Sequence, residues 1–465
     1  MSHGAAKFVP MSDVSTLRSR VSGPVLISGD EGYAEESEAW IQNFVHTPDV
    51  VVGAASAEDV VEAVKFAAAN GLAVRIQGSG HGSHAAITNG MLITTKRLNA
   101  VTVDPVTRIA TLGAGVLADA AIAAAAEHGL APITGSSGTV GITGLLLGGG
   151  LGPLARSFGF GSDWVREFEV VTGGGELVRA NADEHPDLFW ALRGGKGGLG
   201  VVTELKVELV ELSTLYGGSL TFDAEHIEAA LRAWVTYTET AHPKVSTSVT
   251  LLRVPDLPFV PEPVRGRALL ALRFAYTGDA ATGEKLAAPL RAAAPVYLDE
   301  LGELPAAEIG RIHNDPPNPT VGWVSGRMLN GFDQDFVTRL LEFAAPGKNF
   351  PFLATEVRHL GSATLTDVPG GSAVGGRSAN GTLTVVGVPN PELFESVIPA
   401  AAEAYFDALA PWLAAENNVN FASAFASEKE YEGAGPPATF TRLAEVKKKY
   451  DPKSLFVFGV HPARG

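Results

Sequence analysis

Apolar residues follow a helical period in some stretches of the chain and a strand period in others. In residues 57–70, Val60, Val64 and Ala67 share one face. Ser56 stands where an N-cap is expected and Gly71 follows the last periodic residue, which predicts a helix between them. The same reasoning predicts the strands Leu72–Ile76, Val101–Asp104, Arg108–Leu112 and Val201–Val210 and a second helix, Leu117–His128.

Residues 212–414 differ in composition from the rest of the chain, because most of the prolines lie there. Strand-like runs alternate with helical runs in this zone. The strands are Ser246–Leu252, Ala268–Tyr276 and Thr382–Val388, and the helices are Ala224–Ala241, Ala280–Ala293 and Glu392–Leu409. Strands covered by helices on one face would suit a substrate-binding domain.

The chain has 465 residues, which is too long for one ordinary core and indicates two or three domains. We expect an α+β domain at residues 1–211, a second domain at 212–414 and a C-terminal segment at 415–465. The apolar end of that segment, Leu455–Val460, is expected to return to the first domain.

Composition excludes several classes of function. The net charge of -16 argues against binding to nucleic acid or to an anionic membrane surface. The absence of cysteine excludes disulfides, thiolate metal sites, cysteine nucleophiles and a cysteinyl cofactor link. No metal-ligand spacing is present, no run of apolar residues is long enough to span a bilayer, and residues 1–13 lack the apolar core of a signal peptide. A cytoplasmic location is therefore expected.

The segment Val74–His84 reads Val-Arg-Ile-Gln-Gly-Ser-Gly-His-Gly-Ser-His. Its three glycines allow a tight loop whose N–H groups can face an anion. His81 stands at the tip of this loop. The combination indicates a diphosphate cofactor that the loop holds and the histidine contacts, with a covalent bond as one form of that contact.

Two further segments are rich in glycine. Residues 135–152 also carry Val140, Ile142 and Leu145–Leu147, which are too apolar for a solvated linker, so we interpret this segment as backbone packed against a flat cofactor. Residues 195–200 match the spacing of a dinucleotide-binding fingerprint. That match is rejected, because a strand follows it where the fingerprint requires a helix.

Nine short motifs occur in the order in which one family of flavoproteins carries them. They are Arg75-x-x-Gly78-x-Gly80-His81, Val103-Asp104-Pro105, Gly113-Ala114-Gly115-Val116, Thr139-Val140-Gly141, Gly148-Gly149-Gly150, Gly159-x-x-x-Asp163, Asp187-Leu188-Phe189-Trp190-Ala191-Leu192-Arg193-Gly194-Gly195, Val201-Val202-Thr203 and Tyr450-Asp451-Pro452. With them the chain resembles the vanillyl-alcohol-oxidase/berberine-bridge-like flavoproteins that have a PCMH-type FAD domain. The resemblance covers essentially the whole chain.

The resemblance implies an α+β fold: a PCMH-type FAD-binding domain of two α+β subdomains (1–211) and a substrate domain whose antiparallel sheet has helices on one face. His81 matches the histidine that the family joins to the 8α carbon of the flavin. The residues expected to bind FAD are Arg75, Ile76, Gln77, Gly78, Ser79, Gly80, His81, Gly82, His84, Ser137, Gly138, Thr139, Gly141, Thr143, Gly144, Gly148, Gly149, Gly150, Gly200 and Val202.

The chain departs from the family pattern where substrate is handled. Ser137 stands where bicovalent members have a cysteine, so FAD is expected to be linked through His81 only. The family's Gly-Asn-Phe-Gly is shortened to Gly198-Leu199-Gly200, and its Tyr-x-Asn reads Asn418-Val419-Asn420. Thr384 replaces an acid or amide, and the terminal Asn-x-Asn is Gly459-Val460-His461. Substrate identity therefore cannot be transferred from relatives.

An oxidation that passes a hydride to flavin usually needs a base near the substrate hydroxyl. We name His461, Tyr431 and Glu356 as candidates, with His359 as a further one. Each also has a structural interpretation: a surface histidine, a packed tyrosine, or the polar face of a strand. Arg377 is equally compatible with an anion contact and with a structural role.

These features predict an FAD-dependent oxidase that removes a hydride from a C–H next to an alcohol or amine of a small organic substrate, such as a sugar, a glycoside or a secondary metabolite. Molecular oxygen would be the acceptor and hydrogen peroxide the product. Two alternatives stay open: a dehydrogenase of the same fold with another acceptor, and a flavin-binding protein whose catalysis has decayed. The substrate, the base and the oligomeric state stay unassigned.

Overall fold

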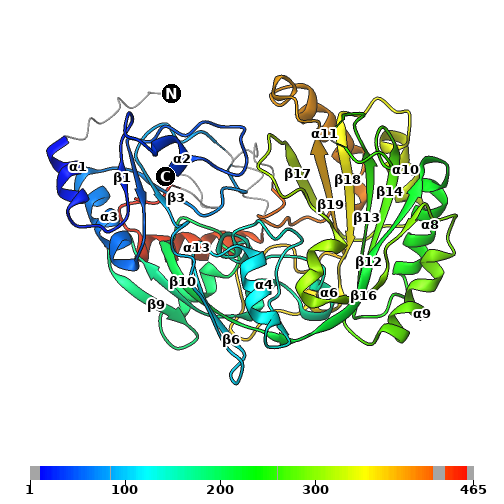
Figure 1. The fold of residues 1–465 in the computed structure, drawn as a ribbon, viewed down its shortest axis with the longest axis horizontal. Helices are drawn as coiled ribbons and strands as arrows, with labels where there is room; N and C mark the ends of the chain where they lie inside the picture. The colour runs from blue at the N-terminus through cyan, green and yellow to red at the C-terminus, as the bar shows by residue number, and fades with distance from the viewer. Residues whose placement is uncertain (1–10, 84, 259, 423–434, 458–465) are drawn as a thin grey trace.

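The computed structural model describes residues 11–457, except 84, 259 and 423–434. Figure 1 shows small sheets with their helices on one side of the molecule and one large sheet with helices along its outer face on the other. Within the described part of the chain, no helix has the length and apolar character needed to cross a bilayer.

The first sheet has four strands in the order β1-β2-β4-β3. They are β1 (Val25–Leu26), β2 (Val50–Gly53), β3 (Val74–Gln77) and β4 (Met91–Thr94). Helix α3 (Ala57–Asn70) packs Val60, Val64 and Ala67 into the core of this sheet. The Ser56 side chain accepts a hydrogen bond from the Asp59 N–H at 3.2 Å, and Gly71 ends the helix with a φ of 61°, which confirms the predicted helix limits.

The second sheet is antiparallel, with the order β5-β6-β10-β8-β9. Its strands are β5 (Val101–Asp104), β6 (Ile109–Gly113), β8 (Val165–Val171), β9 (Leu177–Asn181) and β10 (Val201–Glu208). Helices α4 (Ala118–Ala126) and α7 (Pro186–Leu192) contribute to the same core. A short pair, β7 (Leu130–Ala131) with β11 (Val210–Glu211), lies beside it.

The large sheet has eight strands, all paired antiparallel, in the order β15-β12-β14-β13-β18-β19-β17, with β16 also on β12. Its strands are β12 (Thr214–Asp223), β13 (Val245–Arg253), β14 (Ala268–Tyr276), β15 (Leu298–Asp299), β16 (Gly302–Pro305), β17 (Val324–Leu329), β18 (Phe352–His359) and β19 (Gly381–Gly387). Its helices are α8 (Ile227–Thr238), α9 (Ala280–Arg291), α10 (Gln334–Ala344) and α11 (Val397–Ala408).

The two faces of the large sheet differ in chemistry because side chains alternate along each strand. One face carries apolar residues such as Val249, Leu272 and Val385, which form a core with the helices. On the other face, Ser248 lies in register between Arg273 and Arg358. We call this second surface the polar face of the large sheet.

The C-terminal residues pack on the small sheets. Helix α13 (Pro437–Tyr450) places Leu443, Val446 and Tyr450 in the core of the second sheet. Phe456 then forms a parallel bridge with Val74 of β3. The proposed domain limits at residues 211 and 414 stay predictions.

The predicted α+β fold class is confirmed, with an antiparallel sheet that has helices on one face. Several predicted elements begin too early: β3 begins at Val74 rather than Leu72, α4 at Ala118 rather than Leu117, and α8 at Ile227 rather than Ala224. Two others have a clear backbone reason. Arg108 has a φ of 56°, so it belongs to the turn and β6 begins at Ile109. The helix predicted from Glu392 begins at Val397, because Ser396 has non-helical backbone after a short 3-10 turn, Pro391–Leu393. Strands β17 and β18 and helix α10 are not among the elements predicted from the sequence.

Candidate active site

The loop after β3 brings His81 against an aromatic ring. The imidazole stacks on Trp40, with ring centroids 4.1 Å apart and planes inclined by 18°. Gly80 has a φ of 80°, and a Cβ on it would come within 2.6 Å of Ala39. Glycine is therefore required at 80 by both backbone conformation and space. A Cβ on Gly82 would meet no atom within 4 Å, so the loop opens on that side.

His81 also joins two of the glycine-rich segments. Its Nδ1 lies 2.9 Å from the Ser79 hydroxyl and its Nε2 lies 3.2 Å from the Thr139 hydroxyl. The Ser79 oxygen accepts a further hydrogen bond from the Gly141 N–H at 3.0 Å. Burial lowers the pKa of His81 to about 4, so the ring is neutral near pH 7 and one of its nitrogens carries a lone pair.

The second glycine-rich segment carries the short helix α5 (Ile142–Leu146). A Cβ on Gly144 would again meet no atom within 4 Å, and the buried Thr143 hydroxyl has no hydrogen-bond partner among the described residues. Gly148, by contrast, lies so close to Asn420 that a Cβ would come within 2.1 Å of its Oδ1. Open backbone at 82 and 144 and an orphaned hydroxyl fit a flat, polar cofactor such as FAD.

Lys196 ties the third glycine-rich segment to the second. Its ammonium donates to the Gly144 carbonyl at 3.0 Å and to Asn420 Oδ1 at 2.5 Å. Burial lowers the pKa of Lys196 to about 8. Reasoning from sequence missed this residue, because it lies inside the fingerprint match that was rejected.

The remaining residues predicted to bind FAD divide into two groups. Most lie on β3 or in the two glycine-rich loops around His81. Gly200 and Val202 instead have a packing explanation, since a Cβ on Gly200 would come within 2.5 Å of Val170 and Val202 pairs with Val170 on β8. His84 lies outside the described residues. Assignment of all these residues to FAD stays a prediction.

Glu356 lies on the polar face between two arginines. Its Oε2 accepts from Arg358 Nε at 2.8 Å, and its Oε1 accepts from Arg273 at 3.2 Å. Burial alone would raise the pKa of Glu356, but the Arg358 and Arg273 guanidinium groups lower it. Glu356 is thus an ionised member of an ion-pair cluster, which makes it a weak proton acceptor at neutral pH.

The other candidates have different surroundings. His359 Nε2 lies 3.1 Å from the Arg156 guanidinium, and burial together with that charge lowers its pKa to about 3. Arg377 pairs with Asp163 and, at 3.1 Å, with Asp367, so it links two segments. His461 and Tyr431 lie outside the described residues. The base therefore stays unassigned.

The sequence left the polar face of a strand open as the structural interpretation of Glu356 and its neighbour Arg358, and β18 places both residues there. Sequence reasoning missed Arg273 and His313, which lie near them. The grouping of Arg273 and His313 with that strand depends on sheet order, which a single sequence does not show.

The fold and the glycine-rich loops around His81 fit a protein with an FAD-binding domain. Residues 48–181 match the family model described as "FAD binding domain". The fold resembles crystal structures of 6-hydroxy-D-nicotine oxidase from Arthrobacter nicotinovorans (TM-score 0.81, 22% identity, covering 95% of this chain and 98% of that one). It also resembles xylooligosaccharide oxidase from Myceliophthora thermophila (TM-score 0.81, 20% identity, 98% and 99%).

Curated relatives match less than half of the chain. (R)-6-hydroxynicotine oxidase of Paenarthrobacter nicotinovorans is 34% identical over 194 residues, which are 41% of this chain and 42% of that protein. FAD-dependent monooxygenase prx3 of Penicillium roqueforti is 36% identical over 214 residues, 45% of this chain and 42% of that protein. The matches thus span less than half the length of these relatives. The chain has the FAD-binding domain and the fold of the berberine-bridge-like flavoproteins, and the resemblance seen in its sequence is confirmed.

Proposed function

We propose that this protein is an FAD-linked oxidase that removes a hydride from a C–H next to an alcohol or amine of a small organic substrate and passes electrons on to molecular oxygen. The observation that carries the proposal is His81: a neutral imidazole held between Ser79 and Thr139 where two glycine-rich loops meet. Bound FAD would supply the hydride acceptor, and oxidases among the similar proteins support that choice of chemistry.

The residues around His81 would hold the cofactor in complementary ways. The backbone of the loop after β3 and of the segment from Gly138 to Gly150 offers N–H groups, and Gly82 and Gly144 leave room for it. The ammonium of Lys196 places a positive charge beside Gly144, which would stabilise negative charge on a bound cofactor.

We further propose that His81 bonds covalently to the flavin. Nucleophilic attack needs a nitrogen lone pair, which a neutral imidazole has. The Ser79 and Thr139 hydroxyls hold both ring nitrogens and so fix the plane of the ring. The chain has no cysteine, so the link would be a single one.

On the substrate side, the segment after the glycine-rich loop faces the large sheet. Leu151 and Phe160 pack with Met328 and Val374 and would exclude water from that side of the site. The hydroxyls of Thr382 and Thr384 on β19 are buried and have no partner among the described residues, so they are available to a substrate. The base that takes the substrate proton stays a prediction, with His461 and Tyr431 as candidates.

Mass spectrometry after acid denaturation tests the proposal. The peptide that contains His81 should carry the mass of one FAD, and His81→Ala should release FAD free on denaturation. His128→Ala, at an exposed position, serves as the control. Purified protein that contains no flavin would refute the proposal, and FAD released free from the unaltered protein would refute the covalent bond alone.

The two alternatives differ in measurable ways. Anaerobic reduction by a substrate followed by fast re-oxidation in air supports an oxidase, and slow re-oxidation supports a dehydrogenase with another acceptor. Tight ligand binding without any reduction would indicate a flavin-binding protein whose catalysis has decayed.

A further inference from the structure

A cavity lies between the segment that follows the cofactor loop and the polar face of the large sheet. Its walls include Leu151 and Pro153 on the first side and Ser246, Arg273 and Arg358 on the second, together with His313, which follows the 3-10 helix Ala306–Ile312. Ser136, from the cofactor loop, donates to Asp315 at 2.6 Å, two residues after His313. The cavity therefore adjoins the proposed FAD site.

Charged groups surround this cavity. Arg273 and Arg358 share the carboxylate of Glu356, and Arg156 bonds to His359 and Leu360, which also line the cavity. Arg156 is 6% exposed, and its guanidinium bonds only to neutral partners among the described residues, namely the Val245 and Leu360 carbonyls and the His359 ring. Its backbone N–H donates to the Ser246 hydroxyl. Asp315, at the rim, adds a second carboxylate. Two lining guanidinium groups, those of Arg273 and Arg358, thus face the carboxylates of Glu356 and Asp315.

Arg358 is the group best placed to meet a ligand. Its Nε donates to Glu356, while its two terminal amino groups have no hydrogen-bond partner among the residues that the structure describes. Its side chain is only 18% exposed and lines the cavity. Two parallel N–H donors of this kind match the two oxygens of a carboxylate.

His313 adds a second, independent sign of a ligand. It is 8% exposed, lines the cavity, and has no partner for either ring nitrogen in the described part of the chain. A buried polar group without a partner is costly, which is explained if a ligand atom accepts its N–H. The ring lies 3.6 Å from Glu356, too far for a hydrogen bond.

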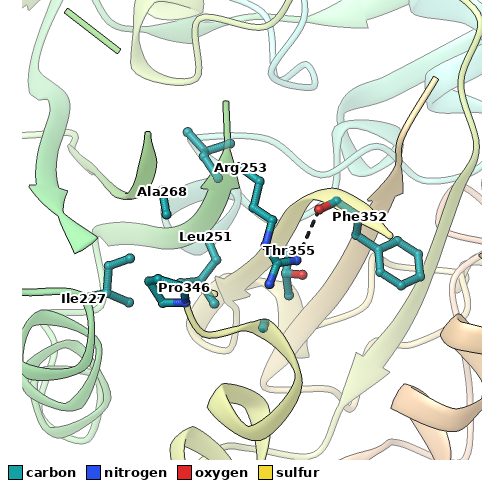
Figure 2. A pocket seen from close by; sticks show the side chains of 9 residues that line it. Ile227, Leu251, Arg253, Ala268, Pro346, Phe352 and Thr355 are labelled. Atoms are coloured by element: carbon teal, nitrogen blue, oxygen red, sulfur yellow. Dashed lines mark hydrogen bonds between the residues drawn. The ribbon is translucent and has the colours of Figure 1, made fainter. Parts of the chain in front are cut away.

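Arg253 shows what a purely structural arginine of the same sheet looks like. Its guanidinium donates to the carbonyls of Ala345, Phe350 and Phe352, and it lies 5.3 Å from the Phe350 ring. Figure 2 shows it pointing into a small hollow on another part of the sheet, where a main-chain carbonyl meets it. Arg358 has no such set of carbonyls.

We infer that this cavity receives a carboxylate group of the substrate, with Arg358 as the two-pronged donor, Arg273 as a supporting charge and His313 as a neutral donor. The inference rests on the proposed function and deepens it: the substrate class becomes organic acids that also carry the oxidisable alcohol or amine. A carboxylate there would fill the N–H donors that Arg358 and His313 leave without partners among the described residues.

Calorimetric titration of the purified protein with benzoate and with its neutral isostere benzamide tests this inference at constant ionic strength. Benzoate should bind at least tenfold more tightly than benzamide. Arg358→Gln should weaken benzoate about 10- to 100-fold and leave benzamide unchanged. Arg267→Gln, which removes an exposed arginine just before β14, should change neither.

Arg358→Lys covers the case in which Arg358→Gln fails to fold, since lysine keeps the positive charge but lacks the two parallel N–H donors of arginine. It should weaken benzoate binding severalfold. Equal binding of benzoate and benzamide, or full benzoate affinity in the folded Arg358 variants, overturns the inference. Flavin content is measured on the same samples. If neutral substrates reduce the flavin and the protein does not prefer benzoate, the proposed oxidase function stands and the carboxylate site is refuted. If the protein binds benzoate selectively but contains no flavin, the oxidase function is refuted and the carboxylate site stands.

Discussion

Gly80 and Gly82 flank His81 and allow the same substitution to be made on two sides of one histidine. A Cβ on Gly80 would lie 2.6 Å from Ala39 atoms, and the φ of 80° is left-handed. A Cβ on Gly82 would meet no atom within 4 Å. The two alanine variants therefore separate damage to the fold from damage to the cofactor site.

Gly80→Ala should lower the free energy of unfolding substantially. The left-handed backbone costs alanine about 1–2 kcal/mol, and overlap with backbone that can move only with Ala39 and Trp40 adds about 1–3 kcal/mol. The total of roughly 2–5 kcal/mol is a large part of the stability of an ordinary domain. The shift also moves His81, so covalent flavin should be lost.

Gly82→Ala should leave the free energy of unfolding of flavin-free protein within about 0.5 kcal/mol. If FAD fills the open side of the loop, the added methyl group should nevertheless weaken FAD binding about tenfold or more. Urea unfolding and the flavin absorbance of each purified variant measure the two quantities. Unchanged flavin content in Gly82→Ala, or unchanged stability in Gly80→Ala, would refute the reasoning for that glycine.

Three further results are expected. Glu356→Gln should lower the free energy of unfolding by about 3–5 kcal/mol, because two buried guanidinium groups lose their shared carboxylate. The same variant should bind benzoate more tightly, because it removes a negative charge beside Arg358. Weaker benzoate binding in the folded variant would contradict this reasoning. Burial lowers the pKa of His359 to about 3 in the folded protein. As pH falls below 6.5, the unfolded chain therefore takes up the proton first and the free energy of unfolding falls, by up to about 4 kcal/mol near pH 3. His359→Gln should flatten the profile of unfolding free energy against pH, and an unchanged slope would show that the ring is protonated when folded. Arg377→Met should destabilise the protein by breaking its buried pair with Asp163 without changing flavin content or benzoate affinity, whereas a selective loss of benzoate affinity would make Arg377 an anion contact.

Much of the FAD side could be predicted from local sequence, because its pieces are local. Ser56 and Gly71 bound α3 through contacts within a few residues. Glycines concentrated around His81 indicate a backbone that must approach something closely, which needs no knowledge of the rest of the fold. The Trp40 stack on His81 was not predicted, since nothing near Trp40 in the sequence points to a histidine more than forty residues away.

The substrate side could not be predicted in the same way. Glu356 was named from its residue type as a base, yet its role depends on Arg273, which is 83 residues away, and on Arg358 beside it on the strand. Lys196 belongs to a motif that was set aside, and its contact with Asn420 joins segments 224 residues apart.

The sequence by itself determined the α+β character of the chain and, through the resemblance that its motifs carry, an FAD-binding domain. Periodicity, caps and glycine spacing can be read in this way because they act over short distances along the backbone. Only the tertiary structure decided which charges share a cavity. The order of strands in the large sheet places Ser248 between Arg273 and Arg358. Burial then makes these charged residues, which are usually exposed, part of an ion cluster with unfilled N–H donors. The reason is that a charge removed from water needs a partner within the protein or in a ligand.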